Sequence, residues 1–272
     1  MPAFDSLRVG KLQESLGQLQ DEVRRHPADS KQRIFLFQLL SVMGQWDRAM
    51  TQLGVLAEMD DSALAMVQTY REVLQCESLR REVFEGRRTP VVIGEPEQWV
   101  ALLIEALRLG GEGCAAESQA VRSRAFELAL PTSGAIDGQR FEWIADSDPR
   151  LGPVLELVVN GRYSWVPFSR IRRLVLEEPS DLRDLVWLPA HVTWTNGGEA
   201  VAFVPVRYPG SEQSADDAIA LARKTEWADQ GSDLYFGLGQ RMFVTDAGEH
   251  PVLEVRHIDL GAEPAPAAEA QR

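Results

Sequence analysis

Cysteine is scarce in this chain of 272 residues, and long apolar segments are missing. The only two cysteines, Cys76 and Cys114, have no zinc-site spacing and cannot build a disulfide framework, and they suit a reducing compartment. The first twenty residues contain no basic segment followed by an apolar one, so the sequence predicts no secretory signal. Apolar runs such as residues 200–206 fall far short of the roughly 20 residues of a membrane helix. We therefore expect a cytoplasmic protein that does not insert into membranes.

Positive charge is also in deficit. The chain has 28 lysine and arginine residues against 41 aspartate and glutamate residues, which gives a net charge of −13. A chain with this charge repels the phosphate backbone of nucleic acids. Arginine doublets occur, but acidic residues separate them and no continuous basic stripe forms. The composition therefore argues against nucleic acid as a partner, while the hydrophobic fraction of 44% is ample for a core.

Sequence motifs for cofactors or catalysis are equally absent. There is no Gly-x-Ser-x-Gly sequence and no phosphate-binding loop, and Gly237-Leu238-Gly239 alone is too short a signal. The histidines are isolated and lack the spacing of a metal site: His26, His191, His250 and His257. The sequence therefore predicts no catalytic residue, no cofactor and no metal.

One acidic cluster leaves an enzymatic alternative open. Asp146 and Asp148, with Arg150 two positions later, form a compact Asp-Ser-Asp-Pro-Arg turn. Such a turn could hold a metal ion or perform the acid–base chemistry of a hydrolase. More often it caps itself and pairs with its own arginine, and we favour that structural interpretation. Catalysis would require these carboxylates, or Asp184, to meet a histidine in a pocket.

Residues 1–130 are predicted to form an all-helical domain. A shift of 34 positions matches Gly10 with Gly44 and Leu19 with Leu53, and this period is that of the tetratricopeptide repeat, a helix–turn–helix unit. Gly44 suits the turn between two helices, and Ala49 is small enough for a close helix contact. A helical bundle without a repeat is the alternative. The predicted helices include residues 11–25, 30–42, 62–85 and 115–130, and residues 87–96 are predicted to be a loop.

Stacked repeat helices leave a concave face that binds segments of other proteins. In the register of the repeat, the residues predicted to line that face are Lys31, Ile34, Gln38, Ser41, Val42, Gln68 and Glu72. Ile34 and Val42 are the candidates to receive apolar anchors of a bound helix, and the polar residues would form the rim. The alternative for Ile34 and Val42 is that they pack against the rest of the chain.

After Pro131 the pattern changes to short strands separated by turns. Asn160-Gly161 and Asn196-Gly197-Gly198 are typical hairpin turns. The predicted strands cover residues 140–145, 155–160, 163–168, 191–195, 200–206, 239–245 and 252–258. Five tryptophans in this half are expected mainly in the core: Trp143, Trp165, Trp187, Trp194 and Trp227.

The predicted fold class is therefore α+β with two domains. The helical, tetratricopeptide-like array of residues 1–130 precedes a β-rich domain of residues 131–260, which we expect to be a small, partly open, SH3-like barrel or a twisted sheet. Residues 261–272 are rich in alanine, proline and glutamate and are predicted to be a disordered tail.

Several longer motifs run through the chain. In the helical half they are Phe35-Leu-Phe-Gln-Leu-Leu40, Gly44-Gln-Trp-Asp-Arg-Ala49 and Gly94-Glu-Pro96 with Trp99. In the β-rich half they are Phe141-Glu-Trp-Ile-Ala-Asp146, Arg150-Leu-Gly-Pro153, Asn160-Gly-Arg-Tyr163, Asp181-Leu-Arg-Asp-Leu-Val-Trp187, Arg207-Tyr-Pro-Gly210 and Gly239-Gln-Arg-Met242. Together these motifs resemble the ImpE/SciE/TagJ family of type VI secretion accessory proteins, over roughly residues 7–258.

The resemblance implies a non-enzymatic adaptor. Proteins of this family are associated with the contractile sheath, through the N-terminal helix of its small subunit TssB, and with sheath recycling by the ATPase ClpV. The resemblance therefore implies a TssB-like sheath subunit and, further, a ClpV-like ATPase as partners. Only the resemblance points to a secretion system, whereas the residues themselves indicate a cytosolic interaction module.

Overall fold

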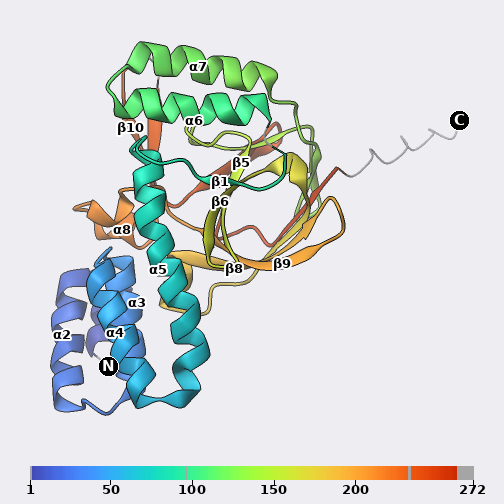
Figure 1. Cartoon of the computed structure of the whole chain (residues 1–272). Coiled ribbons are helices and arrows are strands. Elements are labelled where there is room, and N and C mark those ends of the chain that lie inside the picture. Colours follow the sequence, from blue (N-terminus) through green and yellow to red (C-terminus); the bar gives the residue numbers. More distant parts are fainter. Residues whose placement is uncertain (1, 96, 232–233, 262–272) are drawn as a thin grey trace, which may run out of the picture.

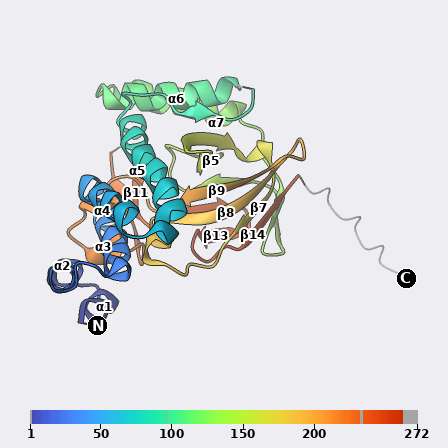
Figure 2. The same cartoon turned by 60° about the horizontal axis from the view of Figure 1, so that its bottom comes forward.

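The computed structural model describes residues 2–95, 97–231 and 234–261. One group of helices lies at the N-terminal end, and the long helix α5 runs from it to an antiparallel pair, α6 and α7, that covers one end of the β-rich half (Figures 1 and 2). The predicted tail, apart from its first residue, lies outside the described residues. The helices of the N-terminal, helical half are α1 (Pro2–Arg8), α2 (Leu12–Arg25), α3 (Ser30–Val42), α4 (Trp46–Met59), α5 (Leu64–Phe84), α6 (Gln98–Gly111) and α7 (Ala115–Leu128), with the 3₁₀ turn η1 (Asp61–Ala63) before α5.

Helix α3 shows why these segments are helical. Asp29 caps its first turn, because the carboxylate Oδ1 accepts hydrogen bonds from the backbone N–H groups of Lys31 and Gln32 at 2.9 and 3.2 Å. The helix ends before Gly44, whose positive φ of 65° allows the chain to turn back into α4. Its second half, residues 36–42, is buried on every side.

The match at an offset of 34 residues corresponds to two successive helical hairpins. Gly10, between α1 and α2, has a φ of 77°, and Gly44, between α3 and α4, has a φ of 65°. The two matched glycines therefore make the same left-handed turn, and Ala49 is fully buried. Helix α1, which the sequence analysis missed, completes the first hairpin. Assignment of these hairpins to the tetratricopeptide class stays a prediction.

The β-rich half forms one large sheet and two small ones. Its strands are β2 (Gly134–Ile136), β3 (Gln139–Phe141), β4 (Ile144–Asp146), β5 (Val154–Val159), β6 (Arg162–Pro167), β7 (Ile171–Leu176), β8 (Trp187–Trp194), β9 (Glu199–Pro205), β10 (Thr225–Asp229), β11 (Tyr235–Gly239), β12 (Met242–Thr245), β13 (Gly248–Pro251) and β14 (His257–Leu260). Three short 3₁₀ turns and one short helix connect them: η2 (Phe168–Arg170), η3 (Leu182–Leu185), η4 (Ser211–Gln213) and α8 (Asp217–Ala220).

The large sheet has the order β1-β6-β5-β9-β8-β7-β14-β2-β3, where β1 (Val91–Val92) comes from the helical half. It is mixed, because β1 runs parallel to β6 while the other neighbours are antiparallel. Strands β1 and β3 are free edges, so the described strands do not close into a barrel. The expectation of a β-rich half is confirmed at this level, but the SH3-like description finds no support in this strand order.

Hairpin turns were the most reliable signals for strands. Asn160 and Gly161, with φ values of 50° and 68°, connect β5 to β6, and Gly197 lies in the turn between β8 and β9. The strand predicted over residues 140–145 is wrong in detail, because it splits into β3 and β4, which belong to different sheets. Strand β14 begins only at the end of the predicted strand 252–258, and β2, β7, β10, β11 and β13 were not predicted.

The prediction that residues 1–130 are entirely helical is wrong at β1. Val91 and Val92, within the predicted loop, pair with Ser164 and Trp165 on β6. Two residues are too short for any periodic pattern, so only the tertiary neighbour β6 makes them a strand.

Two clusters of buried apolar residues fill the molecule. One is confined to the β-rich half and lies on one face of the sheet. The other continues from the helices into the strands, so that Leu39 and Leu53 belong to the same cluster as Trp165 and Trp187. Trp165 and Trp187 are core residues as predicted, whereas Trp143 and Trp227 are 38% and 40% exposed. The domain boundary near residue 130 stays a prediction.

Candidate interaction surface

The residues predicted to face a partner lie on α3 and α5, which both pack against α4. Four of them are accessible, three fully and one in part: Lys31, Gln68, Glu72 and Ile34. The other three are buried, with at most 5% of their surface exposed: Gln38, Ser41 and Val42. The predicted anchor position Val42 therefore faces the interior of the chain, and the predicted groove is open only in part.

The β-rich half covers the C-terminal end of α3, where Ser41 and Val42 lie. Arg207 donates from Nη1 to the backbone oxygen of Val42 at 2.6 Å and from Nη2 to that of Ser41 at 3.4 Å. The last carbonyls of a helix lack partners within the helix, and the buried guanidinium supplies them here. Turn η3 also packs against α3, and its Arg183 lies over the Tyr70 ring of α5, 4.6 Å from the ring centroid. The inner side of the helical array is therefore occupied by its own chain.

Glu72 and the α5 face around it lie against the β5–β6 turn. A Cβ atom on Gly161 would come within 2.5 Å of Glu72 Oε2, and the positive φ of 68° at this turn favours glycine. Cys76, one helical turn later, donates from its thiol to the backbone oxygen of Gly161 at 3.4 Å. The exposed carboxylate of Glu72 therefore stands at the seam between the two halves, where a partner could contact both.

Asp146 is fully buried and each of its oxygens accepts hydrogen bonds. Arg241 donates to Oδ2 from Nε at 2.9 Å and from Nη2 at 2.7 Å. Oδ1 accepts from the backbone N–H of Asp148 at 2.8 Å and from the Tyr208 hydroxyl at 3.1 Å. Burial raises the pKa of Asp146 to about 6, although Arg241 opposes the shift.

Both carboxylate oxygens of Asp148 also accept hydrogen bonds. They accept from Arg150, at its backbone N–H (2.9 Å) and at Nη2 of its guanidinium (2.6 Å), and from the backbone N–H of Gly237 at 2.8 Å. The Arg150 guanidinium lies between two aromatic rings, 5.1 Å from the Phe84 centroid and 4.2 Å from that of Phe236. The cluster thus caps its own turn, and Asp148 pairs with Arg150 as expected, while the cation of Asp146 is the distant Arg241.

The histidines do not meet these carboxylates. Among the described residues, no hydrogen bond joins Asp146, Asp148 or Asp184 to a histidine: His191 contacts Glu177 Oε1 at 3.3 Å on the surface instead. Within the same residues, no three histidine, cysteine, aspartate or glutamate side chains are grouped so that they could hold a metal ion. The arrangement required by the hydrolase alternative is not formed.

A chain of buried ion pairs extends from Asp146 to α5. Arg241 contacts Glu156 Oε2 with Nη1 at 3.2 Å, and Arg80 of α5 donates from Nε to Glu156 Oε1 at 2.7 Å. Arg80 also approaches Glu77 at 3.6 Å, and Glu77 accepts from the Trp187 indole at 2.7 Å. These charges lie at the contact between α5 and the large sheet, and they fix how the two halves meet.

Arg80 and Arg241 lower the pKa of Glu156, the central carboxylate of this series of ion pairs. Burial alone would raise the pKa of Glu156, but Arg80 and Arg241, with the hydroxyl that Tyr163 donates at 2.6 Å, outweigh it and hold the pKa below its usual value. Burial raises the pKa of Glu77, which is farther from its arginine. Burial lowers the pKa of Arg207 to about 10. The geometry supports a rigid junction between the halves.

No sequence motif predicted this network, although one signal was present. Glu156 is the only charged residue in the strand Val-Leu-Glu-Leu-Val-Val of β5, which is otherwise apolar on both faces. A single carboxylate at the centre of such a strand requires a buried cation. The sequence could not show which arginine supplies it, because Arg80 and Arg241 lie 76 and 85 positions away.

Known proteins match this chain both in its β-rich half and over nearly its whole length. The model of the ImpE protein family matches residues 138–259, which lie within the β-rich half. The type VI secretion system accessory component TagJ of Pseudomonas aeruginosa is 53% identical over 260 residues, covering 96% of this chain and 91% of that protein. The chain belongs to the ImpE/TagJ family.

A solved structure shares the whole architecture of this ImpE/TagJ chain. The crystal structure of protein VPA1032 from Vibrio parahaemolyticus superposes with a TM-score of 0.89 at 23% identity, covering 97% of this chain and 98% of that one. Helices and strands thus keep one relative arrangement in both molecules. In the part of the chain that the structure describes, no helix is long and apolar enough to cross a membrane.

Proposed function

We propose that this ImpE/TagJ chain is a non-enzymatic, cytoplasmic accessory component of a type VI secretion system that binds the small, TssB-like subunit of the contractile sheath. The observation that carries the proposal is the 53% identity with TagJ over 96% of the chain. Binding of the N-terminal helix of the sheath subunit would assist sheath assembly or its recycling by a ClpV-like ATPase. The full engagement of Asp146 and Asp148 by neighbouring groups supports an adaptor rather than a hydrolase.

The accessible part of the predicted groove is the proposed contact surface. Lys31 lies on α3, and Gln68 and Glu72 lie on α5, and all three are exposed. Ile34 is half-buried and offers one apolar contact to a bound helix. Because Val42 is buried beneath the β-rich half, an incoming helix would meet the edge where α5 adjoins the Gly161 turn, and both halves would contribute to binding.

A triple change tests this surface. Lys31→Glu, Gln68→Ala and Glu72→Lys remove or reverse its polar groups without touching the core. We expect capture of a synthetic peptide of the sheath subunit's N-terminal helix to weaken at least tenfold, measured by fluorescence anisotropy, at an unchanged melting temperature. The matched control, Arg124→Glu on the exposed face of α7, should bind the peptide as the parent does.

Undiminished binding by the triple variant would refute the assignment to α3 and α5. The β-rich half would then be the region to test. If neither variant nor parent binds the peptide or the intact sheath subunit, the proposed partner itself is wrong.

A further inference from the structure

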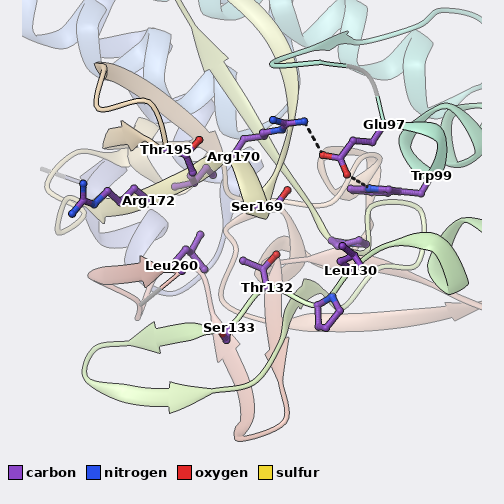
Figure 3. A pocket seen from close by; sticks show the side chains of 14 residues that line it. Glu97, Trp99, Leu130, Thr132, Ser133, Ser169, Arg170, Arg172, Thr195 and Leu260 are labelled. Carbon is purple, nitrogen blue, oxygen red and sulfur yellow. Dashed lines mark hydrogen bonds and ion pairs between the residues drawn. The ribbon is translucent and has the colours of Figure 1, made fainter. Parts of the chain in front are cut away.

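A cleft of about 790 Å³ lies at the other end of the molecule from α3. The start of α6, the linker after α7 and the segment from η2 into β7 surround it (Figure 3). Trp99 and Leu130 form one side, and Ser169, Arg170 and Arg172 form another. The proposed sheath contact uses none of these residues, so any role of the cleft is independent of it.

Arg172 lies at a β-bulge in β7. Ile171 pairs with Trp194 and Arg173 pairs with Thr193, so Arg172 is an extra residue in β7. Such a bulge re-aims side chains and occurs often beside functional sites. Arg173 is paired with Asp259 at 3.3 Å, whereas no ion pair or hydrogen bond joins the Arg172 side chain to any residue that the structure describes.

Arg170 and Trp99 are fixed by one shared carboxylate. Glu97 accepts from Arg170 Nη2 at 3.1 Å through Oε1 and from the Trp99 indole at 2.8 Å through Oε2 (Figure 3). This arrangement holds the rim of the cleft in place. It also leaves the Arg170 Nε atom buried without an acceptor.

The lining as a whole favours an anion. Among the described residues of the lining, Arg170, Arg172 and Glu97 carry charges, so two cations face one anion there, in a chain whose net charge is −13. Four hydroxyl groups also line the cleft, and none makes a side-chain hydrogen bond within the described part of the chain: Thr132, Ser133, Ser169 and Thr195. An arginine without a partner, beside free hydroxyls, is suited to bind a carboxylate.

Apolar groups show that the ligand is more than a small ion. Leu130 is 83% exposed and lies at the cleft opposite Leu260, with two prolines, Pro131 and Pro153, along the wall. Such a volume and mixed lining fit several residues of a peptide. We propose that the cleft binds an acidic, apolar-flanked segment of a partner protein. One of its carboxylates pairs with Arg172, and its apolar side chains pack on Leu130 and Leu260.

A random library of twelve-residue peptides displayed on phage, selected on the immobilised full chain, tests this site. We expect enrichment of peptides with aspartate or glutamate beside leucine, isoleucine or phenylalanine. Recovery of these peptides should fall at least tenfold on Arg172→Ala and on Leu130→Ser. The matched control is Arg173→Ala, because this neighbouring arginine lies outside the cleft and its exposed ion pair contributes little stability.

Each other outcome overturns the proposal. Enrichment without acidic residues, equal recovery on Arg172→Ala, or no enrichment over the bare support excludes an acidic segment as the ligand. Equal binding of the selected peptides after aspartate and glutamate are replaced by asparagine and glutamine excludes it as well. The selected peptides should still bind the Lys31, Gln68 and Glu72 triple variant, so failure of the sheath assignment leaves this result unchanged.

Discussion

The interior of the N-terminal helices and the junction between α5 and the large sheet are equally buried but chemically different. Ala49, Leu53 and Leu56 have no exposed surface and belong to a cluster of buried apolar side chains that contains no ion pair. At the junction, Glu156 and Arg241 are just as inaccessible, yet they carry full charges that partners neutralise. Both regions are buried, but apolar packing stabilises the first and ion pairs connect the groups of the second.

The difference predicts how each region responds to change. Apolar packing loses stability in proportion to the volume added or removed, and neighbouring side chains can adjust in part. A buried charge depends on specific partners, so loss of one partner leaves the others unpaired in a medium that solvates them poorly. We therefore expect the charged junction to lose more stability when one partner is removed than the apolar region loses when a side chain is enlarged, and the following variants test this expectation.

The largest effect is expected from Arg241→Met. This change removes the cation between Asp146 and Glu156 and leaves two buried carboxylates close together. We expect the free energy of unfolding to fall by about 5 kcal/mol, the upper end for breaking a buried pair, measured by urea denaturation at pH 7. Arg172→Met on the surface is the control and should change stability by less than about 0.5 kcal/mol. Equal effects of the two variants would contradict the contrast between the regions.

A smaller and pH-dependent effect is expected from Glu156→Gln. At pH 7 the loss should be about 3 kcal/mol, because the amide oxygen still accepts one hydrogen bond. The pKa of Glu156 is lowered in the folded chain from its ordinary 4.5, so the unfolded chain binds the proton first as the pH falls. The parent therefore gains stability from this group above pH 4.5 and loses it below.

The difference between the parent and Glu156→Gln should accordingly shrink as the pH falls from 5 toward 3. Urea denaturation at pH 7, 5, 4 and 3 measures it. Asp146, whose pKa burial raises to about 6, has the opposite sign and favours the folded state as the pH falls from 6 to 4, but it is present in both proteins. A difference that grows in acid would show that Arg80 and Arg241 do not dominate at Glu156.

The helical half was predictable because its signals are local. The bounds of α3, Ser30–Val42, follow from Asp29 as a cap and Gly44 as a turn, both within a few residues of the helix ends. The hairpin at Asn160-Gly161 follows from the same kind of signal. Strand β1 and the bulge at Arg172 depend on neighbours from distant parts of the chain, and no local pattern encodes them.

The candidate surface was predictable only in part, for the same reason. Lys31 and Glu72 are exposed, and exposure on one side of a helix can be expected from the helical period alone. That period could not show that Arg207, 165 positions after Val42, covers the end of α3. Nor could composition reveal the positive cleft, because only the fold leaves Arg172 without an ion pair among the described residues.

The smallest effect on the free energy of unfolding is expected in the apolar region, at Ala49. Ala49 is fully buried in α4, which packs against both α3 and α5. Ala49→Leu inserts a larger side chain into this contact and should reduce the free energy of unfolding by about 1–3 kcal/mol through overpacking. Thr51→Leu, on the exposed side of the same helix, is the control and should stay within about 0.5 kcal/mol of the parent. Because Ala49→Leu changes no titratable group and lies in the apolar cluster, the loss should be the same at pH 7 and pH 4, unlike that from Glu156→Gln. A melting temperature equal to that of the parent would show that the helices around Ala49 are looser than the structure indicates.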